Sequence, residues 1–189
     1  MKKLLFVHFL FQSLYCLGQT DINKIYHSQS YQMGLYKNYN EFITNSPSLR
    51  KDLAVRKKKN LHLHGAEGYT FDIMDGKKVG KVFGFSDGND IYVQGLRTEG
   101  YHKLEFIGPF SYYTFTQSVY SAATAIIPDH LVVIDSTGKY RDGTANYIRS
   151  LLNGKDKNLF NAFIKEPNNK DMLVRIKYLK VLNENLIKR

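Results

Sequence analysis

The stretch YTFDIMDGKKVGKVFGFSDGNDIYV, residues 69–93, decides the fold because its apolar side chains recur at every second position. This alternation is typical of extended strands, and it covers residues 69–73 and 81–85. Asp75-Gly76 lies between the two segments, and Asp87-Gly88-Asn89 follows the second; both are tight-turn signals. We therefore expect 69–73 and 81–85 to be a strand and its returning partner, followed by a turn into another strand.

Further strand candidates follow at short intervals, at residues 90–93, 102–107, 110–115 and 131–134. The connections between them are short, and parallel strands would need long crossovers. This spacing favours an antiparallel meander over βαβ units. We expect one sheet over about residues 61–134.

Beyond Asp142 the apolar residues recur at helical spacing. Three segments carry the pattern: Ala145, Ile148, Leu151 and Leu152; Leu159, Phe160, Phe163 and Ile164; and Met172, Ile176, Leu179, Leu182 and Leu186. Gly154 is expected to end the first helix and Pro167 the second. The predicted fold class is α+β, an antiparallel β-meander followed by two or three C-terminal helices over about residues 143–187, in a single domain over residues 34–189.

The composition of the 189-residue chain agrees with one globular domain. Its hydrophobic fraction is 43%, and 14 Tyr and 12 Phe supply enough rings for a core. A single Cys excludes an internal disulfide framework and a cysteine-cluster zinc site. No motif indicates a cofactor, and none is expected. The formal charge of +10 points toward anionic partners without selecting one.

The first 18 residues have the features of a secretory signal peptide. Lys2 and Lys3 precede an apolar stretch at residues 4–17, and Cys16 and Gly18 place small side chains before a cut between Gly18 and Gln19. As a helix this stretch would span only about 21 Å, less than a bilayer core of about 30 Å. We expect an exported protein, periplasmic or secreted, with a cysteine-free mature chain. The alternatives are an N-terminal membrane anchor and a lipoprotein acylated at Cys16.

Residues 19–33 are polar with scattered tyrosines, and we expect them to form a loosely held leader. Tyr39, Phe42 and Ile43 then recur at the spacing of a short amphipathic helical turn. Ser46-Pro47 ends it, because the residue before a proline is pushed out of the helical region.

Gly84-Phe85-Ser86-Asp87-Gly88 matches the G-x-S-x-G pattern of the nucleophile elbow in serine hydrolases. That chemistry requires a strand-to-helix turn that exposes the serine hydroxyl, with acid and histidine partners later in the chain. Here a turn leads into another strand. We expect a hairpin, and a catalytic Ser86 is the alternative.

Two further motifs suggest metal ligands. His62 and His64 share a face if the segment is extended, but zinc or copper would need a third ligand. Residues 87–90 are rich in oxygen atoms, but they lack the spaced ligand series of a calcium loop. We expect ordinary surface histidines, a plain turn and no metal site.

The run Arg56-Lys57-Lys58-Lys59 is a candidate binding site for an anionic polysaccharide, lipid headgroups or nucleic acid. Export makes nucleic acid the least natural of these partners. The other interpretation of the run is a solvated loop or a protected sheet edge.

Tyr112, Tyr113 and Phe115, together with Tyr92 and Tyr101, place rings on both faces of the strand region. Outward tyrosines stack on sugar rings or line protein interfaces. Tyr92, Tyr112 and Tyr113 are therefore candidate binding residues beside the basic run. The alternative is that these rings cover the sheet or pack beneath the C-terminal helices.

Several segments resemble a group of exported, mostly uncharacterised proteins of the Bacteroidota. The matching pieces are GLYKNYNEF at residues 34–42, NSPS at 45–48, GFSDGNDIY at 84–92, Tyr101-x-x-Leu104 and GPFSY at 108–112, with a helical tail over 159–185. The resemblance implies export and an α+β domain. It carries no activity, ligand or catalytic residue.

These observations together predict an exported, non-enzymatic binding or interaction domain of the cell envelope. Its expected partner is an anionic envelope component, a glycan or a protein, not a nucleic acid, and the chain is not expected to span a membrane. The alternative is an exported hydrolase that uses Ser86 or a histidine-centred site. A third possibility is a purely structural envelope protein.

Overall fold

The structure, a computed structural model, describes residues 24–60, 66–74, 79–96, 100–116, 119–120, 125–126 and 129–188. Three sequence-based predictions lie outside these residues: the signal peptide with its cut between Gly18 and Gln19, the pair His62 and His64, and the Asp75-Gly76 turn. They stay predictions.

The larger sheet consists of β1 (Gly34–Tyr36), β2 (Leu53–Asn60), β3 (Ala66–Ile73), β4 (Gly84–Ser86), β5 (Ile91–Gln94) and β6 (Tyr101–Lys103). Its strands run antiparallel to their neighbours in the order β1-β4-β5-β6-β3-β2. The turn at residues 87–90 joins β4 to β5 as expected. The antiparallel sheet of the predicted α+β fold is therefore confirmed.

The partners of β3 differ from the prediction. The strand pairs with β2 and β6, while β4 pairs with β1 and β5, so residues 69–73 and 81–85 do not form a hairpin. β2 pairs with β3 because Leu53 and Val55 lie opposite Ile73 and Phe71 and pack into the same apolar cluster. The basic residues that follow hide this alternation in the sequence. The sheet consequently begins at β1, well before the expected residue 61.

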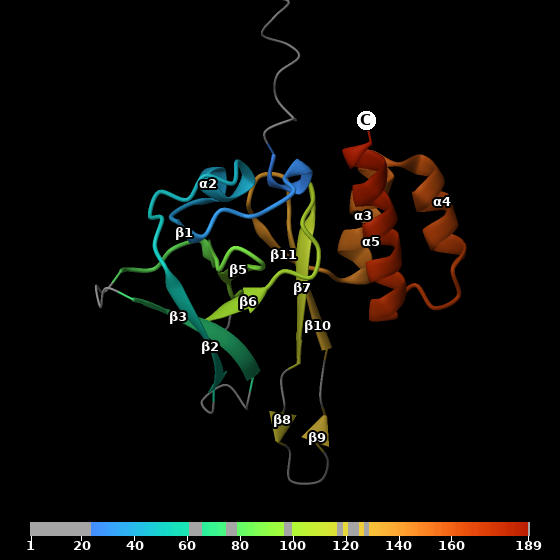
Figure 1. Cartoon of the computed structure of the whole chain (residues 1–189). Helices are drawn as coiled ribbons and strands as arrows, with labels where there is room; N and C mark the ends of the chain where they lie inside the picture. Colours follow the sequence, from blue (N-terminus) through green and yellow to red (C-terminus); the bar gives the residue numbers. More distant parts are fainter. Residues whose placement is uncertain are drawn as a thin grey trace, which may run out of the picture.

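A second sheet contains β7 (Ser111–Thr116), β10 (Asp129–Ile134) and β11 (Tyr140–Asp142), in the order β11-β10-β7. Beyond β7 and β10 the same hairpin continues to the short pair β8 (Val119–Tyr120) and β9 (Ala125–Ile126). Figure 1 shows β7 and β10 lying between the larger sheet on one side and the helices on the other. The second sheet is thus the middle layer.

Both faces of the middle layer are buried. Tyr113, Val132 and Ile134 pack with Tyr36, Ile91 and Val93 of the larger sheet, while Tyr112, Leu131 and Val133 pack with Ile148, Leu152 and Phe163 of the helices. Successive side chains of a strand point to opposite faces, so alternate residues of β7 and β10 enter different cores. The middle sheet therefore separates two apolar cores, and the cluster that includes Leu53 and Val55 is a third.

Three C-terminal helices, α3 (Ala145–Lys155), α4 (Lys157–Lys165) and α5 (Met172–Ile187), form the third layer, as predicted. Thr144, Asp156 and Asp171 each cap one helix, because a side-chain oxygen accepts hydrogen bonds from backbone N–H groups of the first turn. Within the described ranges, no helix combines the length and the apolar character needed to cross a membrane.

Asn183 joins α5 to the start of β7. Its Nδ2 donates to the carbonyl oxygens of Phe110 at 2.9 Å and Leu179 at 3.1 Å, and its Oδ1 accepts from the Phe110 N–H at 2.8 Å. The side chain is fully buried. Gly108 makes room for it, since a Cβ there would lie 2.8 Å from the Asn183 Oδ1. One amide group therefore supplies hydrogen bonds between the middle sheet and the helical layer.

The described part of the predicted leader, residues 24–33, contributes one residue to the core. A short 3₁₀ helix, η1 (Ile25–His27), places Ile25 in the core with no exposed surface. After the short helix α2 (Tyr39–Ile43), Asn45 holds the segment: its Oδ1 accepts from the Gln32 N–H at 3.0 Å, and its Nδ2 donates to the Ser30 carbonyl at 3.0 Å. The polar composition concealed one apolar anchor and one buried amide.

Replacing Asn45 by glycine is expected to lower the free energy of unfolding by about 1–3 kcal/mol, because buried hydrogen-bonding groups lose their partner. Glycine tolerates the positive φ of 50° at this position, so the backbone adds no strain. Hydrogen exchange in residues 28–32 should become faster, as measured by mass spectrometry. Asn89→Gly, in an exposed turn, is the matched control; unchanged exchange in 28–32 would contradict the anchoring role.

Candidate functional site

Five aromatic rings gather on one face of the larger sheet, and we call Tyr69, Phe71, Phe85, Tyr92 and Tyr101 the aromatic face. The rings of Phe71 and Phe85 lie 4.9 Å apart although β5 and β6 separate their strands in the sheet. Tyr69 contacts Tyr92 at the same centroid distance. The sheet therefore curls so that its rings form a continuous cluster.

The rings of the aromatic face differ in exposure. Phe85 is fully buried and Tyr92 is 5% exposed, so these two rings form the floor of the cluster. Tyr69, Phe71 and Tyr101 are partly exposed and pack against this floor. A partly exposed ring on a rigid sheet is the arrangement that stacks on a flat apolar ligand face.

Hydrogen-bonded polar groups border the aromatic face. The Tyr92 hydroxyl donates to the Asp87 Oδ2 at 3.3 Å, and the Lys103 Nζ lies 2.7 Å from the Asp90 Oδ2. Burial, followed by the charges of Asp87 and Asp90, raises the pKa of Tyr92, so its hydroxyl remains a donor. The hydrogen bond to Asp90 raises the pKa of Lys103 and keeps this side chain cationic.

The strand register adds a second cation to this border. Lys57 of β2 lies directly opposite Tyr69, and Lys103 lies opposite Tyr92. Cross-strand partners share a face of the sheet, so both lysines project on the side of the aromatic face. The register also places position Lys59 on this face, and positions Arg56 and Lys58 on the opposite face. On the opposite face, the Arg56 Nε lies 2.6 Å from the Asp72 Oδ2.

The structure buries the three tyrosines that the sequence singled out as ligand contacts. Tyr112 is 1% exposed beneath the helices, Tyr113 is 0% exposed between the two sheets, and Tyr92 lies in the floor described above. Their predicted direct stacking on a ligand is therefore wrong. Alternation along β7 sends its rings to both faces, and another layer covers each of them.

Tyr69 and Phe71 lie in a strand that the sequence predicts, but local alternation does not mark them as binding residues. Lys103 was also missed. The available signal was the recurrence of aromatic residues at every second position in several strands, which becomes one cluster only when the order of the strands is known. A curled sheet with non-sequential neighbours does not follow from local alternation.

Ser86 lies in β4 with no exposed surface, and its Oγ accepts from the Gly88 N–H at 3.0 Å. Gly88 has a φ of +95°, and the chain turns there into β5 rather than into a helix. A nucleophile elbow needs an exposed hydroxyl ahead of a helix. Ser86 stabilises the β4–β5 turn, as the hairpin interpretation predicted.

The oxygen-rich residues 87–90 also serve the turn. The Asp87 Oδ1 accepts from the backbone N–H groups of Asn89 at 2.9 Å and Asp90 at 2.8 Å, a common side-chain mimic of a turn. In the part of the chain that the structure describes, no group of three histidine, cysteine or acidic residues is arranged to hold a metal ion.

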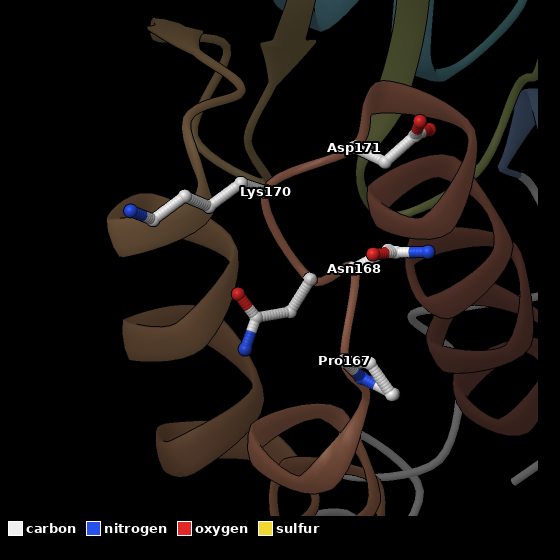
Figure 2. Close-up of a pocket in the computed structure, with 5 residues that line it drawn as sticks. Pro167, Asn168, Lys170 and Asp171 are labelled. Atoms are coloured by element: carbon white, nitrogen blue, oxygen red, sulfur yellow. The ribbon is translucent and has the colours of Figure 1, made fainter.

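An open hollow beside the loop between α4 and α5 is lined by Pro167, Asn168, Asn169, Lys170 and Asp171. Figure 2 shows the side chains of Lys170 and Asp171 pointing in opposite directions. The Asp171 carboxylate is already used to cap α5, where it accepts from the Leu173 N–H at 2.7 Å. Ligand sites bring polar groups together, and this hollow does not. The aromatic face is therefore the stronger candidate.

Comparison with known proteins adds no assignment. No protein-family model matches the chain, and neither a curated protein nor a solved structure matches it.

Proposed function

We propose that this protein is an exported, non-enzymatic binding domain of the cell envelope that holds an acidic glycan against the aromatic face. The observation that carries the proposal is the combination of three partly exposed rings, Tyr69, Phe71 and Tyr101, with two lysines, Lys57 and Lys103, on one face of the larger sheet. The expected export signal in residues 1–18 places the domain in the periplasm or outside the cell.

Each part of the aromatic face matches one part of such a ligand. The C–H face of a sugar ring packs against an aromatic ring, and its hydroxyl groups hydrogen-bond at the ring edges. Asp87 and Asp90 offer carboxylate oxygens to sugar hydroxyls, and the lysines attract carboxylate or sulfate groups. The positive charge of the whole chain favours the approach of an anionic polymer.

Replacing Tyr69 by alanine is expected to weaken binding of a uronic-acid oligosaccharide about tenfold, equivalent to about 1.4 kcal/mol. Tyr69 is the partly exposed ring that lies opposite Lys57, so its removal takes away stacking surface beside a cation. Isothermal titration calorimetry measures the change, and Tyr69→Phe should retain most of the affinity because it keeps the ring.

Tyr147→Ala is the matched control, because Tyr147 is a partly exposed tyrosine on α3 in the helical layer. A neutral glucose oligomer of the same length should bind more weakly than the acidic one, and raising the salt concentration should narrow that difference. Equal loss of affinity in Tyr69→Ala and Tyr147→Ala, or equal binding of the neutral and acidic oligomers, would contradict the proposal.

A further inference from the structure

The two edges of the larger sheet are not equivalent. At one edge, Leu35 of β1 forms a bridge with Leu49, and its N–H donates to the Leu49 carbonyl at 2.8 Å, so another segment already covers this edge. At the other edge is β2, which pairs with β3 and, among the described residues, has no strand on its outer side. Figure 1 shows the β2–β3 hairpin on the opposite side of the molecule from α3–α5.

β2 is long and regular enough to receive another strand. It has eight residues, all paired in register with β3, and Arg56 and Lys57 are exposed. In an antiparallel edge strand, alternate residues direct their N–H and C=O groups away from the sheet. These groups form a template for one more strand, the geometry by which extended peptides add to sheet edges.

The charge of β2 restricts which strand can pair with it. Four consecutive basic residues, Arg56-Lys57-Lys58-Lys59, are the fourth to seventh residues of the strand. The two strands of the hairpin contain only two acidic residues, Glu67 and Asp72. Like charges placed opposite each other across a strand pair are destabilising. A second copy of β2 is therefore repelled, whereas a strand with a run of acidic residues is attracted on both faces.

We propose that β2 docks an acidic, extended segment of a protein partner by strand addition, which makes that segment the seventh strand of the larger sheet. The main-chain hydrogen bonds of the edge supply the register, and the basic run selects an acidic sequence. This surface shares Lys57 and position Lys59 with the side of the aromatic face, but strand addition uses the main-chain groups of the edge, which the proposed glycan binding does not use.

The test uses the purified full chain and a ten-residue synthetic peptide with four consecutive glutamates flanked by valine and threonine. Amide hydrogen exchange measured by NMR should slow at least tenfold at alternate residues of β2 when the peptide is saturating. A peptide with the same sequence but with every backbone amide N-methylated keeps its charges and loses its backbone donors on both edges. It should bind at least tenfold more weakly in a fluorescence polarisation titration.

Charge specificity is tested by Lys58→Glu combined with Lys59→Glu. This double variant should bind the acidic peptide at least tenfold more weakly. Lys180→Glu on α5 combined with Lys188→Glu at the C-cap of that helix makes the same change in net charge and should have little effect. Equal binding of the N-methylated peptide, or an absence of protection in β2, would overturn strand addition and indicate attraction to any anionic polymer. A concentration-dependent dimer of the unmodified chain, with slowed exchange at alternate residues of β2 in the absence of peptide, would overturn the acidic partner in favour of a second copy.

Discussion

Replacing Asn183 by aspartate is expected to lower the free energy of unfolding by about 3–5 kcal/mol at neutral pH. The Asn183 Nδ2 donates to the carbonyls of Phe110 and Leu179, and a carboxylate oxygen in its place would face both carbonyls without a proton to share. The side chain has no exposed surface, so water cannot take over these interactions. The docking of α5 on the middle sheet should weaken accordingly.

The pH dependence of this variant distinguishes a loss of stability caused by the buried negative charge from a loss caused by the altered side chain itself. Burial among carbonyls raises the pKa of the introduced carboxyl above its unfolded value, so the stability lost by Asn183→Asp should increase as the pH rises through that pKa and shrink in acid. Denaturant unfolding of the variant and the unmodified protein at pH 5 and pH 7 gives the difference. The exposed Asn161→Asp on α4 is the control and should cost less than about 0.5 kcal/mol. A pH-independent loss in Asn183→Asp would contradict the proposed cause.

His102 is expected to make the protein about 3 kcal/mol less stable at pH 4 than at pH 7. Its ring is 4% exposed and stacks on Tyr113 at 4.7 Å, between β6 and the middle sheet. Burial lowers the pKa of His102 to about 4, whereas an unfolded histidine titrates near 6.5. The unfolded chain therefore binds a proton that the folded chain excludes, and stability falls as the pH drops from about 6.5 to about 4.

The variant His102→Gln removes this titration. Between pH 6.5 and 4.5 its stability should change with a slope smaller by about 1.4 kcal/mol per pH unit than that of the unmodified protein, although it starts from a lower value at pH 7. Chemical denaturation followed by circular dichroism at several pH values measures the slope. His27→Gln is the control, because it makes the same substitution at a histidine that is exposed at the end of η1. Parallel pH profiles for His102→Gln and the unmodified protein would rule out His102 as the cause.

The helices and most strands were predictable because their signals are local. The apolar spacing of Met172, Leu179 and Leu186 and the turn at residues 87–90 depend only on nearby residues, and both occur as expected. β2 was not predictable as the partner of β3, because its pairing residues Leu53 and Val55 are followed by four basic residues. Strand order depends on contacts between distant segments, which alternation does not encode.

The sequence predicts the basic run and the aromatic strands of the candidate site, but not which of their residues lie together. The basic run was interpreted as either a loop or a sheet edge, and the structure places it in the edge strand β2. The choice of aromatic residues failed because Tyr112 and Tyr113 are adjacent in a strand with both faces covered, a property of the layers and not of the segment. Tyr69 and Lys103 enter the site through cross-strand pairs that the sequence does not specify.

The middle sheet has a consequence for how the chain can be divided. Because β7 and β10 contribute alternate side chains to two cores, cutting the chain between sheet and helices would expose one apolar face of that sheet. The helices are therefore no detachable appendage, although their sequence pattern is distinct from that of the strands. Loss of either outer layer would expose the apolar side chains on one face of the sheet between them. The three layers should therefore unfold as one cooperative unit.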